Sequence, residues 1–201
     1  MKEYPADFWN QFYETPEYVY GTSPNAFFKE QINNLPKGKI LFAAEGEGRN
    51  AVYAATKLWD VHAFDSSDTG KNKALKLAAD NNVEINYVVN DVLNFETKEQ
   101  FDVIGLFFAH FPTDIRKKAH KHLLQFLKKD GLIIFEAFAK EQYSKSSGGS
   151  KNLEMLFSLK EIEEEFLELN FEILEQNTVI LAEGERHKGE AEVIQFVGRK
   201  I

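Results

Sequence analysis

The sequence predicts an α/β fold in which a mostly parallel sheet carries helices on both faces. From Lys39 onward, short apolar runs alternate with amphipathic stretches of helical period, as in successive β-α-β units. The last two apolar runs are joined by a short polar segment that leaves no room for a crossover helix, so these two strands must pair antiparallel. We therefore expect a doubly wound, seven-stranded sheet that ends in a C-terminal antiparallel hairpin.

The individual elements follow from the period of the apolar residues. Runs rich in β-branched and aromatic residues predict five strands, at residues 40–43, 61–64, 85–89, 101–108 and 131–138. Apolar residues spaced three or four positions apart predict helices at 50–58, 68–81, 113–129 and 159–169. The two strands of the hairpin are expected at 171–181 and 190–199, with the polar residues 182–189 as their loop.

We expect one domain over residues 1–201, with two parts of different composition. Residues 1–37 are rich in aromatic side chains and are punctuated by Pro5, Pro16 and Pro24, which suggests a helical cap over the C-terminal edge of the sheet. Residues 38–201 are expected to form the α/β core, which carries the candidate ligand site. The Ser/Gly-rich segment 144–150 is expected to be a flexible loop near the site.

Composition limits the classes of function. The chain contains no cysteine, which excludes disulfides, thiolate metal sites and a cysteine nucleophile, and suggests a cytoplasmic protein. Its net charge of −8 argues against a nucleic-acid partner, and no apolar run approaches the roughly 20 residues that span a membrane. The histidines and carboxylates show no spacing typical of metal ligands. We expect a monomer or homodimer that acts on a small molecule.

A glycine turn follows the first strand and opens the next helix. Gly46 and Gly48 allow a tight turn and close approach of a ligand, and they also fit the dinucleotide fingerprint. Glu45 and Glu47 flank the turn, and each would repel a pyrophosphate by about 1 kcal/mol or more. The acidic turn suits S-adenosylmethionine better, because that cofactor has no phosphate and carries positive charge. The alternative is a plain tight turn without a ligand.

Acidic residues follow the second and third strands. Asp65 lies 19 residues after Gly46, where a carboxylate can bind a ribose diol; the alternative is a helix N-cap, and Ser67 or Asp68 could cap while Asp65 binds. Asp91 could accept from an adenine amino group while Val92 packs on the ring, although such an aspartate is usually a turn residue. Ligands of open α/β sheets bind outside the C-terminal strand ends, where these residues should gather.

Together these motifs resemble those of class I S-adenosylmethionine-dependent methyltransferases with a Rossmann-like sheet, most closely the tellurite-resistance and thiopurine methyltransferase-like group. The similarity covers nearly the whole chain and is carried by residues 18–25, 45–51, Asp65, Asp91, 110–112 and 131–138. The resemblance implies S-adenosylmethionine as cofactor, methyl transfer to a thiol, metalloid oxyanion or similar soft nucleophile, and a cofactor site. The residues expected in that site are Tyr20, Gly21, Glu45, Gly46, Gly48, Arg49, Asn50, Asp65, Ser66, Asp91, Val92 and Phe107.

The chain departs from the family pattern at two positions. Phe42 stands where the family commonly has an acidic residue, and Glu45 stands where it commonly has Cys or Gly. We expect Glu45 to supply the compensating negative charge for the ammonium group of the cofactor.

The catalytic candidates are His110 after the fourth strand, and Arg186, His187 and Lys188 in the hairpin loop. Methyl transfer mainly needs a well-positioned nucleophile in a site that excludes water, and a base only if the nucleophile must lose a proton. The resemblance favours the loop cluster as the binding site for the acceptor; the alternatives are a solvated hairpin tip and a turn histidine. A catalytically inactive S-adenosylmethionine-binding sensor or partner protein is the second functional hypothesis, and the acidic turn and the hairpin argue against a third, a nicotinamide-dependent oxidoreductase.

Overall fold

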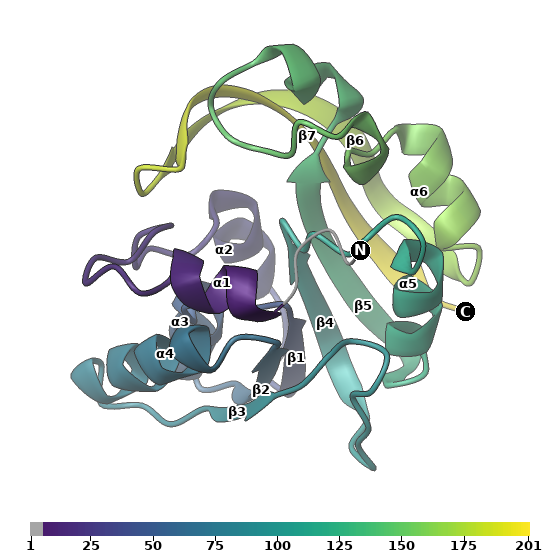
Figure 1. Cartoon of the computed structure of the whole chain (residues 1–201). Coiled ribbons are helices and arrows are strands. Elements are labelled where there is room, and N and C mark those ends of the chain that lie inside the picture. Colours follow the sequence, from purple (N-terminus) through teal and green to yellow (C-terminus); the bar gives the residue numbers. More distant parts are fainter. Residues whose placement is uncertain (1–5) are drawn as a thin grey trace.

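A seven-stranded sheet forms the centre of the protein (Figure 1), seen here in a computed structural model that describes residues 6–201. The strand order is β3-β2-β1-β4-β5-β7-β6, and β7 alone runs against the other strands. The predicted fold class is therefore confirmed. The strands are β1 (Lys39–Ala43), β2 (Asp60–Asp65), β3 (Asn86–Val89), β4 (Phe101–Phe107), β5 (Leu127–Phe138), β6 (Leu169–Glu183) and β7 (His187–Lys200).

Helices cover both faces of the sheet, and alternate strand residues supply the two hydrophobic layers. Along β1, Phe42 packs with α2 (Ala26–Asn33), α3 (Arg49–Thr56) and α4 (Asp68–Asp80) on one face. Its neighbour Leu41 packs with α5 (Arg116–Leu124) and α6 (Leu159–Glu165) on the opposite face. The sheet thus lies between two apolar cores, and only its strand ends are available to a ligand.

The N-terminal segment splits into two parts with different surroundings. Helix α1 (Ala6–Phe12) is held against the start of α4 by Asn10, whose Oδ1 accepts from the Ser67 hydroxyl at 2.7 Å and from the Thr69 N–H at 3.2 Å. Helix α2 instead lies on the sheet face, where the Phe28 ring is fully buried against Phe42. Residues 1–5 of the expected cap lie outside the described residues.

Two helices end earlier than their apolar period predicts. Helix α5 ends at Leu124, not at residue 129, because the chain turns into β5: Phe126 O accepts from Phe101 N at 2.9 Å and Leu127 pairs with Phe101. Helix α6 ends at Glu165, and Leu169 already begins β6. The first buried residue of the next strand can fall on the same apolar spacing as the helix. The apolar pattern therefore predicted both helices to be longer than they are.

The hairpin strands are longer, and their connection shorter, than predicted. Only residues 184–186 lie between β6 and β7, so His187 and Lys188 belong to β7 rather than to a polar loop. Strand β6 forms the outer edge of the sheet, with a β-bulge between Phe171 and Ile173. Two 3₁₀ segments, η1 (Lys140–Ser144) and η2 (Leu153–Met155), cross between β5 and α6. The expected Ser/Gly loop leaves η1 and is tied to the hairpin through Ser147, whose hydroxyl donates to Glu190 O at 2.6 Å.

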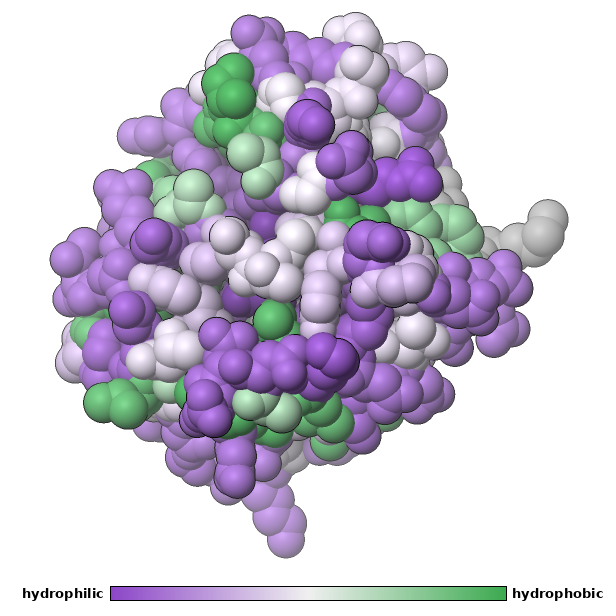
Figure 2. All heavy atoms as spheres, turned by 90° about the vertical axis from the view of Figure 1, so that its left-hand side faces the viewer, coloured by the Kyte–Doolittle hydropathy of each residue, from purple (hydrophilic) through white to green (hydrophobic). Residues whose placement is uncertain are grey.

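The face that carries α1, α3 and α4 is mostly hydrophilic, with hydrophobic residues in small separate patches (Figure 2). Among residues 6–201, no helix has the length and apolar character needed to cross a membrane.

A buried ionic cluster joins α5 to α6. The Glu165 carboxylate accepts from Arg116 Nη2 at 2.6 Å and Nε at 3.0 Å, and its other oxygen lies 2.7 Å from His120 Nδ1. All three side chains are buried. Burial opposes ionisation of Glu165, but the hydrogen bond and charge of His120, together with Arg116, lower its pKa.

We expect Glu165→Gln to lower the free energy of unfolding by about 3 kcal/mol, because the buried Arg116 would lose its nearest counterion and keep only Glu161 at 3.7 Å. Urea titration followed by circular dichroism measures this loss. The matched control is Glu164→Gln, an exposed glutamate on the same helix, for which we expect a change within about 0.5 kcal/mol. Equal losses in the two variants would show that the cluster adds nothing specific.

Candidate functional site

A pocket opens at the C-terminal ends of β1, β2, β3 and β4, the position where open α/β sheets bind ligands. Its empty volume, counted together with space open to solvent, is about 970 Å³. Trp9 and Tyr13, from α1 and the turn that follows it, form part of its wall. The apolar side chains Phe64, Val92 and Ile115 lie in the same pocket as the polar residues Glu45, Asp65 and Asp91.

The two glycines of the turn have positive φ and serve the packing around the pocket. Gly46 has φ +61°, and its N–H donates to Asp65 Oδ2 at 3.0 Å. Gly48 has φ +87° at the N-cap of α3, and a Cβ there would lie 2.5 Å from the Ala74 Cβ of α4. The second glycine therefore permits close packing of two helices, while neither glycine itself lines the pocket.

The two glutamates that flank the turn have different roles. Glu45 lines the pocket, and its Oε1 accepts from the N–H groups of Asn50 at 2.9 Å and Ala51 at 2.7 Å, at the start of α3, where backbone N–H groups have no partner within the helix. Burial raises the pKa of Glu45 to about 7 despite these bonds. Glu47 instead pairs with Lys73 and accepts from Val19 N at 2.8 Å, so it holds the loop before α2 rather than facing the pocket.

Asp65 is oriented for the pocket by its own turn. Its Oδ1 accepts from Ser67 N at 2.9 Å, and Ser67 caps α4 through a bond from Gly70 N at 3.0 Å. Asp65 and its neighbour Ser66 both line the pocket, while Ser67 caps the helix. The cap therefore leaves Asp65 available to a ligand. Burial raises the pKa of Asp65 to about 6, against the opposing hydrogen bonds.

Two residues of the pocket wall have backbone conformations that side chains rarely adopt. Ala44 after β1 has φ +55°, and Phe108 after β4 has φ +51°. Phe108 N nevertheless donates to Glu136 O at 2.8 Å, which ties this turn to β5. Such strain is typical of functional sites, where the surrounding structure must enforce it.

Arg49 forms the wall of the pocket opposite the aspartates. Its Nη2 donates to Glu183 Oε2 at 2.8 Å, while its Nη1 is buried without a hydrogen-bond partner among residues 6–201. The other Glu183 oxygen accepts from Asn25 Nδ2 at 3.1 Å. Asn25 Nδ2 also donates to Glu136 at 2.8 Å, and the Asn25 N–H donates to Asn50 Oδ1 at 2.9 Å. Arg49 and Asn50 both line the pocket, and they are held by Glu183 and by the Asn25 backbone, respectively.

A second pocket, of about 830 Å³ empty volume, adjoins the first. The two share Trp9, Tyr20, His110 and His187, and Arg186 and the Ser/Gly loop contribute to the outer one. The predicted cluster of Arg186, His187 and Lys188 does not act as one group, because successive side chains of a strand point to opposite faces. His187 is 3% exposed and faces inward, whereas Lys188 points outward and lines neither pocket.

Tyr20 lies at the junction of the two pockets, with its ring 4.5 Å from the His187 ring. Its loop is fixed from two sides. Glu47 binds the loop backbone, and Gly184 of the hairpin turn lies so close that a Cβ there would be 2.2 Å from Val19 O. Gly21 lines a separate groove beside the hairpin instead of the main pocket.

Most of the predicted residues thus gather at the pocket. Those that line it are Tyr20, Glu45, Arg49, Asn50, Asp65, Ser66, Asp91, Val92, Phe107, His110 and His187. Phe42, the departure from the family pattern, is buried on the helical face and does not reach the pocket. Phe108, Asn90 and the two carboxylates Glu136 and Glu183 were not among the site residues predicted from the sequence. Only Asn90 could have been found from the sequence, because it stands next to Asp91 after the third strand.

Comparisons with known proteins bear on the fold. Residues 40–131 match the methyltransferase domain family. A solved structure from work on the conversion of a disulfide bond into a thioacetal group during echinomycin biosynthesis superposes with a TM-score of 0.80 at 15% identity, covering 97% of this chain and 91% of the other. TehB from Haemophilus influenzae gives 0.74 at 16% identity, covering 98% of this chain and 67% of the other.

A third similar structure contains a cofactor product. Magnesium protoporphyrin IX methyltransferase from Synechocystis, with bound S-adenosylhomocysteine, gives a TM-score of 0.73 at 13% identity and covers 98% of this chain and 97% of the other. At these identities the likeness establishes a shared fold. No protein of curated function matches the sequence significantly.

The raised pKa of Glu45 predicts a pH dependence of stability. Its folded pKa of about 7 lies above the ordinary value of 4.5, so its stabilising contribution is complete below pH 4.5 and is lost as the pH rises through 7. In Glu45→Gln this loss is absent, so the free energy of unfolding relative to wild type should rise by about 1 kcal/mol between pH 6 and 8. Urea titrations of the unliganded protein at both pH values measure the difference. The exposed Glu84→Gln variant should show no such rise, and an equal rise there would contradict the assignment.

Proposed function

We propose that this chain, in which residues 40–131 are a methyltransferase domain, transfers a methyl group from S-adenosylmethionine to a small, soft nucleophile such as a thiol or a metalloid oxyanion. The observation that carries the proposal is the continuity of the two pockets. The inner pocket lies at the strand ends, and the outer pocket reaches it at a junction formed by Trp9, Tyr20, His110 and His187. A donor and an acceptor can therefore meet at one point from opposite sides.

The donor set of the inner pocket fits S-adenosylmethionine. The orphaned Nη1 of Arg49 is a buried cationic donor that suits the carboxylate of the methionine part. Asp65 and Asp91 offer carboxylates for the ribose and the adenine amino group, and Val92 offers an apolar surface for the ring. The faces of Trp9 and Tyr20 suit a sulfonium cation. Glu45 adds negative charge for the ammonium group.

Methyl transfer needs little covalent chemistry from the protein. When bound, S-adenosylmethionine supplies a methyl group activated by a positively charged sulfur. The aromatic residues at the junction exclude water and restrict the approach of the acceptor to a line through the methyl carbon. Two imidazoles, His110 and His187, stand at this junction to receive a proton from an acceptor that carries one.

The outer pocket indicates the class of acceptor. Its lining combines the aromatic rings of Phe8, Trp9 and Phe12 with the guanidinium of Arg186, which lies 5.5 Å above the Phe12 ring. Such a pocket favours a small acceptor that is polarisable and becomes anionic when it loses its proton. The similar structures include one from work on the conversion of a disulfide into a thioacetal and a magnesium protoporphyrin IX methyltransferase, so the fold alone does not select the acceptor.

Calorimetry with S-adenosylhomocysteine tests the cofactor assignment. We expect Asp65→Asn to weaken binding about 10- to 100-fold, because hydrogen bonds to a charged group are worth about 1.5–3 kcal/mol. The matched control is Asp60→Asn at the other end of β2, where the side chain is exposed and pairs with Lys39. Binding of NAD but not of S-adenosylhomocysteine would contradict the proposal.

Turnover assays then separate an enzyme from a sensor. Formation of S-adenosylhomocysteine is measured with S-adenosylmethionine and, in turn, alkyl thiols, aryl thiols, selenite and tellurite. We expect turnover with at least one of these acceptors. Tight binding of the cofactor without turnover of any acceptor would favour the catalytically inactive binding protein instead.

A further inference from the structure

The His187 ring stands where the two pockets meet, and it is held there on several sides. Its centroid lies 4.5 Å from that of Tyr20, 4.6 Å from Phe108 and 5.1 Å from Phe138. Its Cδ2 edge faces Gly148 of the Ser/Gly loop so closely that a Cβ on this glycine would come within 2.8 Å. Aromatic packing and the loop therefore leave the imidazole little freedom to turn.

One ring nitrogen of His187 is directed at a carboxylate. Nδ1 lies 3.3 Å from Glu183 Oε2, and the imidazole and the carboxylate come from the two ends of the β6–β7 turn. A carboxylate can only accept, so this contact selects the tautomer that carries its proton on Nδ1. Nε2 then has a free lone pair, and among the described residues it has no hydrogen-bond partner.

The carboxylate itself is locked in place. Arg49 Nη2 donates to the same Oε2 at 2.8 Å, and Asn25 Nδ2 donates to Oε1 at 3.1 Å. Burial works against ionisation, but the hydrogen bond from His187 and the charge of Arg49 lower the pKa of Glu183 to about 2. Glu183 is thus a fixed anion at neutral pH, and two of its partners, Arg49 and His187, line the inner pocket.

From this geometry we infer that Glu183 is a positioning residue, which holds His187 with Nδ1 protonated so that Nε2 takes a proton from the methyl acceptor. The inference rests on the proposed function. As the bond from the acceptor atom to the methyl carbon forms, the carbon–sulfur bond breaks and leaves its electron pair on sulfur. The proton of the acceptor moves to Nε2, and the resulting imidazolium remains paired with Glu183.

The charges around His187 suit a base that starts neutral. Glu183 on β6 faces Nδ1, Arg49 on α3 lies behind Glu183, and Glu136 on β5 lies beside it through the shared Asn25 amide. Burial lowers the pKa of His187, with Glu183 acting in the opposite direction and Arg49 in the same direction. Burial, together with the nearby charge of His187, lowers the pKa of His110 to about 4. The His110 imidazole is therefore neutral at pH 7 and is a weak base. Arg186 and Lys188 flank His187 in the chain.

The decisive comparison uses two thiols with the full-length protein. At pH 7, 2-mercaptoethanol must lose a proton to react, whereas 2-nitro-5-thiobenzoate is already ionised. We expect Glu183→Gln to lower kcat about tenfold or more with 2-mercaptoethanol, with a smaller change in KM, and to have little effect with 2-nitro-5-thiobenzoate. His187→Gln should show the same selectivity with a loss of about 100-fold.

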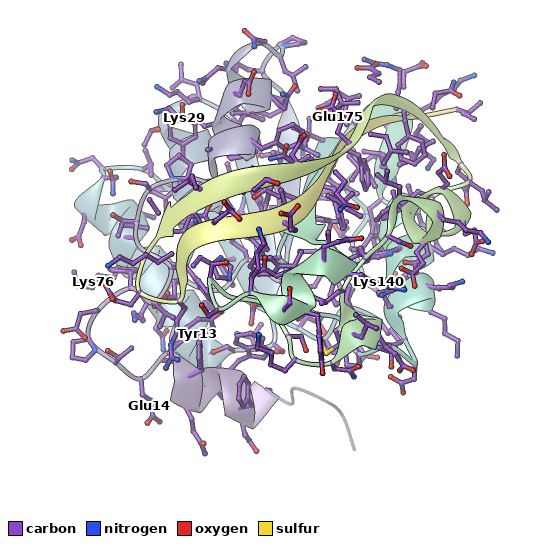
Figure 3. The ribbon with its side chains drawn as sticks, turned by 90° about the horizontal axis from the view of Figure 1, so that it is seen from above. Tyr13, Glu14, Lys29, Lys76, Lys140 and Glu175 are labelled. Carbon is purple, nitrogen blue, oxygen red and sulfur yellow. The ribbon has the colours of Figure 1, made fainter. Side chains whose placement is uncertain are left out.

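The matched control is Glu175→Gln, since Glu175 lies near the middle of the same strand, away from the turn, and is exposed (Figure 3). It should leave both rates unchanged. A loss of equal size with both thiols in Glu183→Gln would overturn the inference and assign Glu183 a purely structural role.

A second measurement does not depend on turnover or on the folding of a variant. Nitrogen-15 NMR of the histidine rings of the wild-type protein reports which ring nitrogen is protonated. We expect His187 to carry its proton on Nδ1, and an Nε2-protonated ring would overturn the inference. Calorimetry with S-adenosylhomocysteine is run on the same sample: absence of binding would count against the proposed function, whereas the wrong tautomer with intact binding would count only against the role of Glu183.

Discussion

The site depends on the buried ion pair between Arg49 and Glu183, residues that lie 134 positions apart in the chain. Arg49 begins the first helix after the glycine turn, and Glu183 ends the strand at the far edge of the sheet. Their side chains are about nine-tenths buried, so each charge needs the other: removing one partner leaves an uncompensated charge that costs several kcal/mol. Because His187 and Asn25 bind the same carboxylate, the ion pair couples the wall of the inner pocket, the loop before α2 and the junction with the outer pocket. The Glu183 carboxylate thus holds residues from the two halves of the chain in fixed positions.

The fold and much of the pocket could be predicted from the sequence because both follow from local patterns. Alternating apolar runs and helical periods define the order of strands and helices, and parallel strands place their C-terminal ends at one edge. Asp65 and Asp91, each directly after a strand, could therefore be assigned to the same pocket without any knowledge of distances. The glycine turn was predicted for the same reason, although the structure shows that Gly48 serves the packing of α3 on α4.

The remaining features depend on tertiary contacts that no local pattern encodes. Glu45 and Glu47 are equivalent in the sequence, but one faces the pocket and the other meets Lys73 and the backbone of Val19. The hairpin loop was predicted too long because residues 182–189 are polar, and polar residues are normally exposed. Once β7 begins at His187, alternation alone decides that this residue points inward and Lys188 outward. Glu136 and Glu183 likewise look like surface carboxylates until Asn25, Gln195 and Arg49 are placed around them.

Strand β6 is the long free edge of the sheet, and its 15 residues would present a ready template for another chain. Two features counter this hazard. The β-bulge at Glu172 interrupts the regular spacing of the edge, and the exposed carboxylates of Glu172 and Glu175 would meet like charges if a second copy added its own β6 alongside. The strand that carries Glu183 at one end thus has, in its other half, two features that oppose edge-to-edge pairing with a second copy.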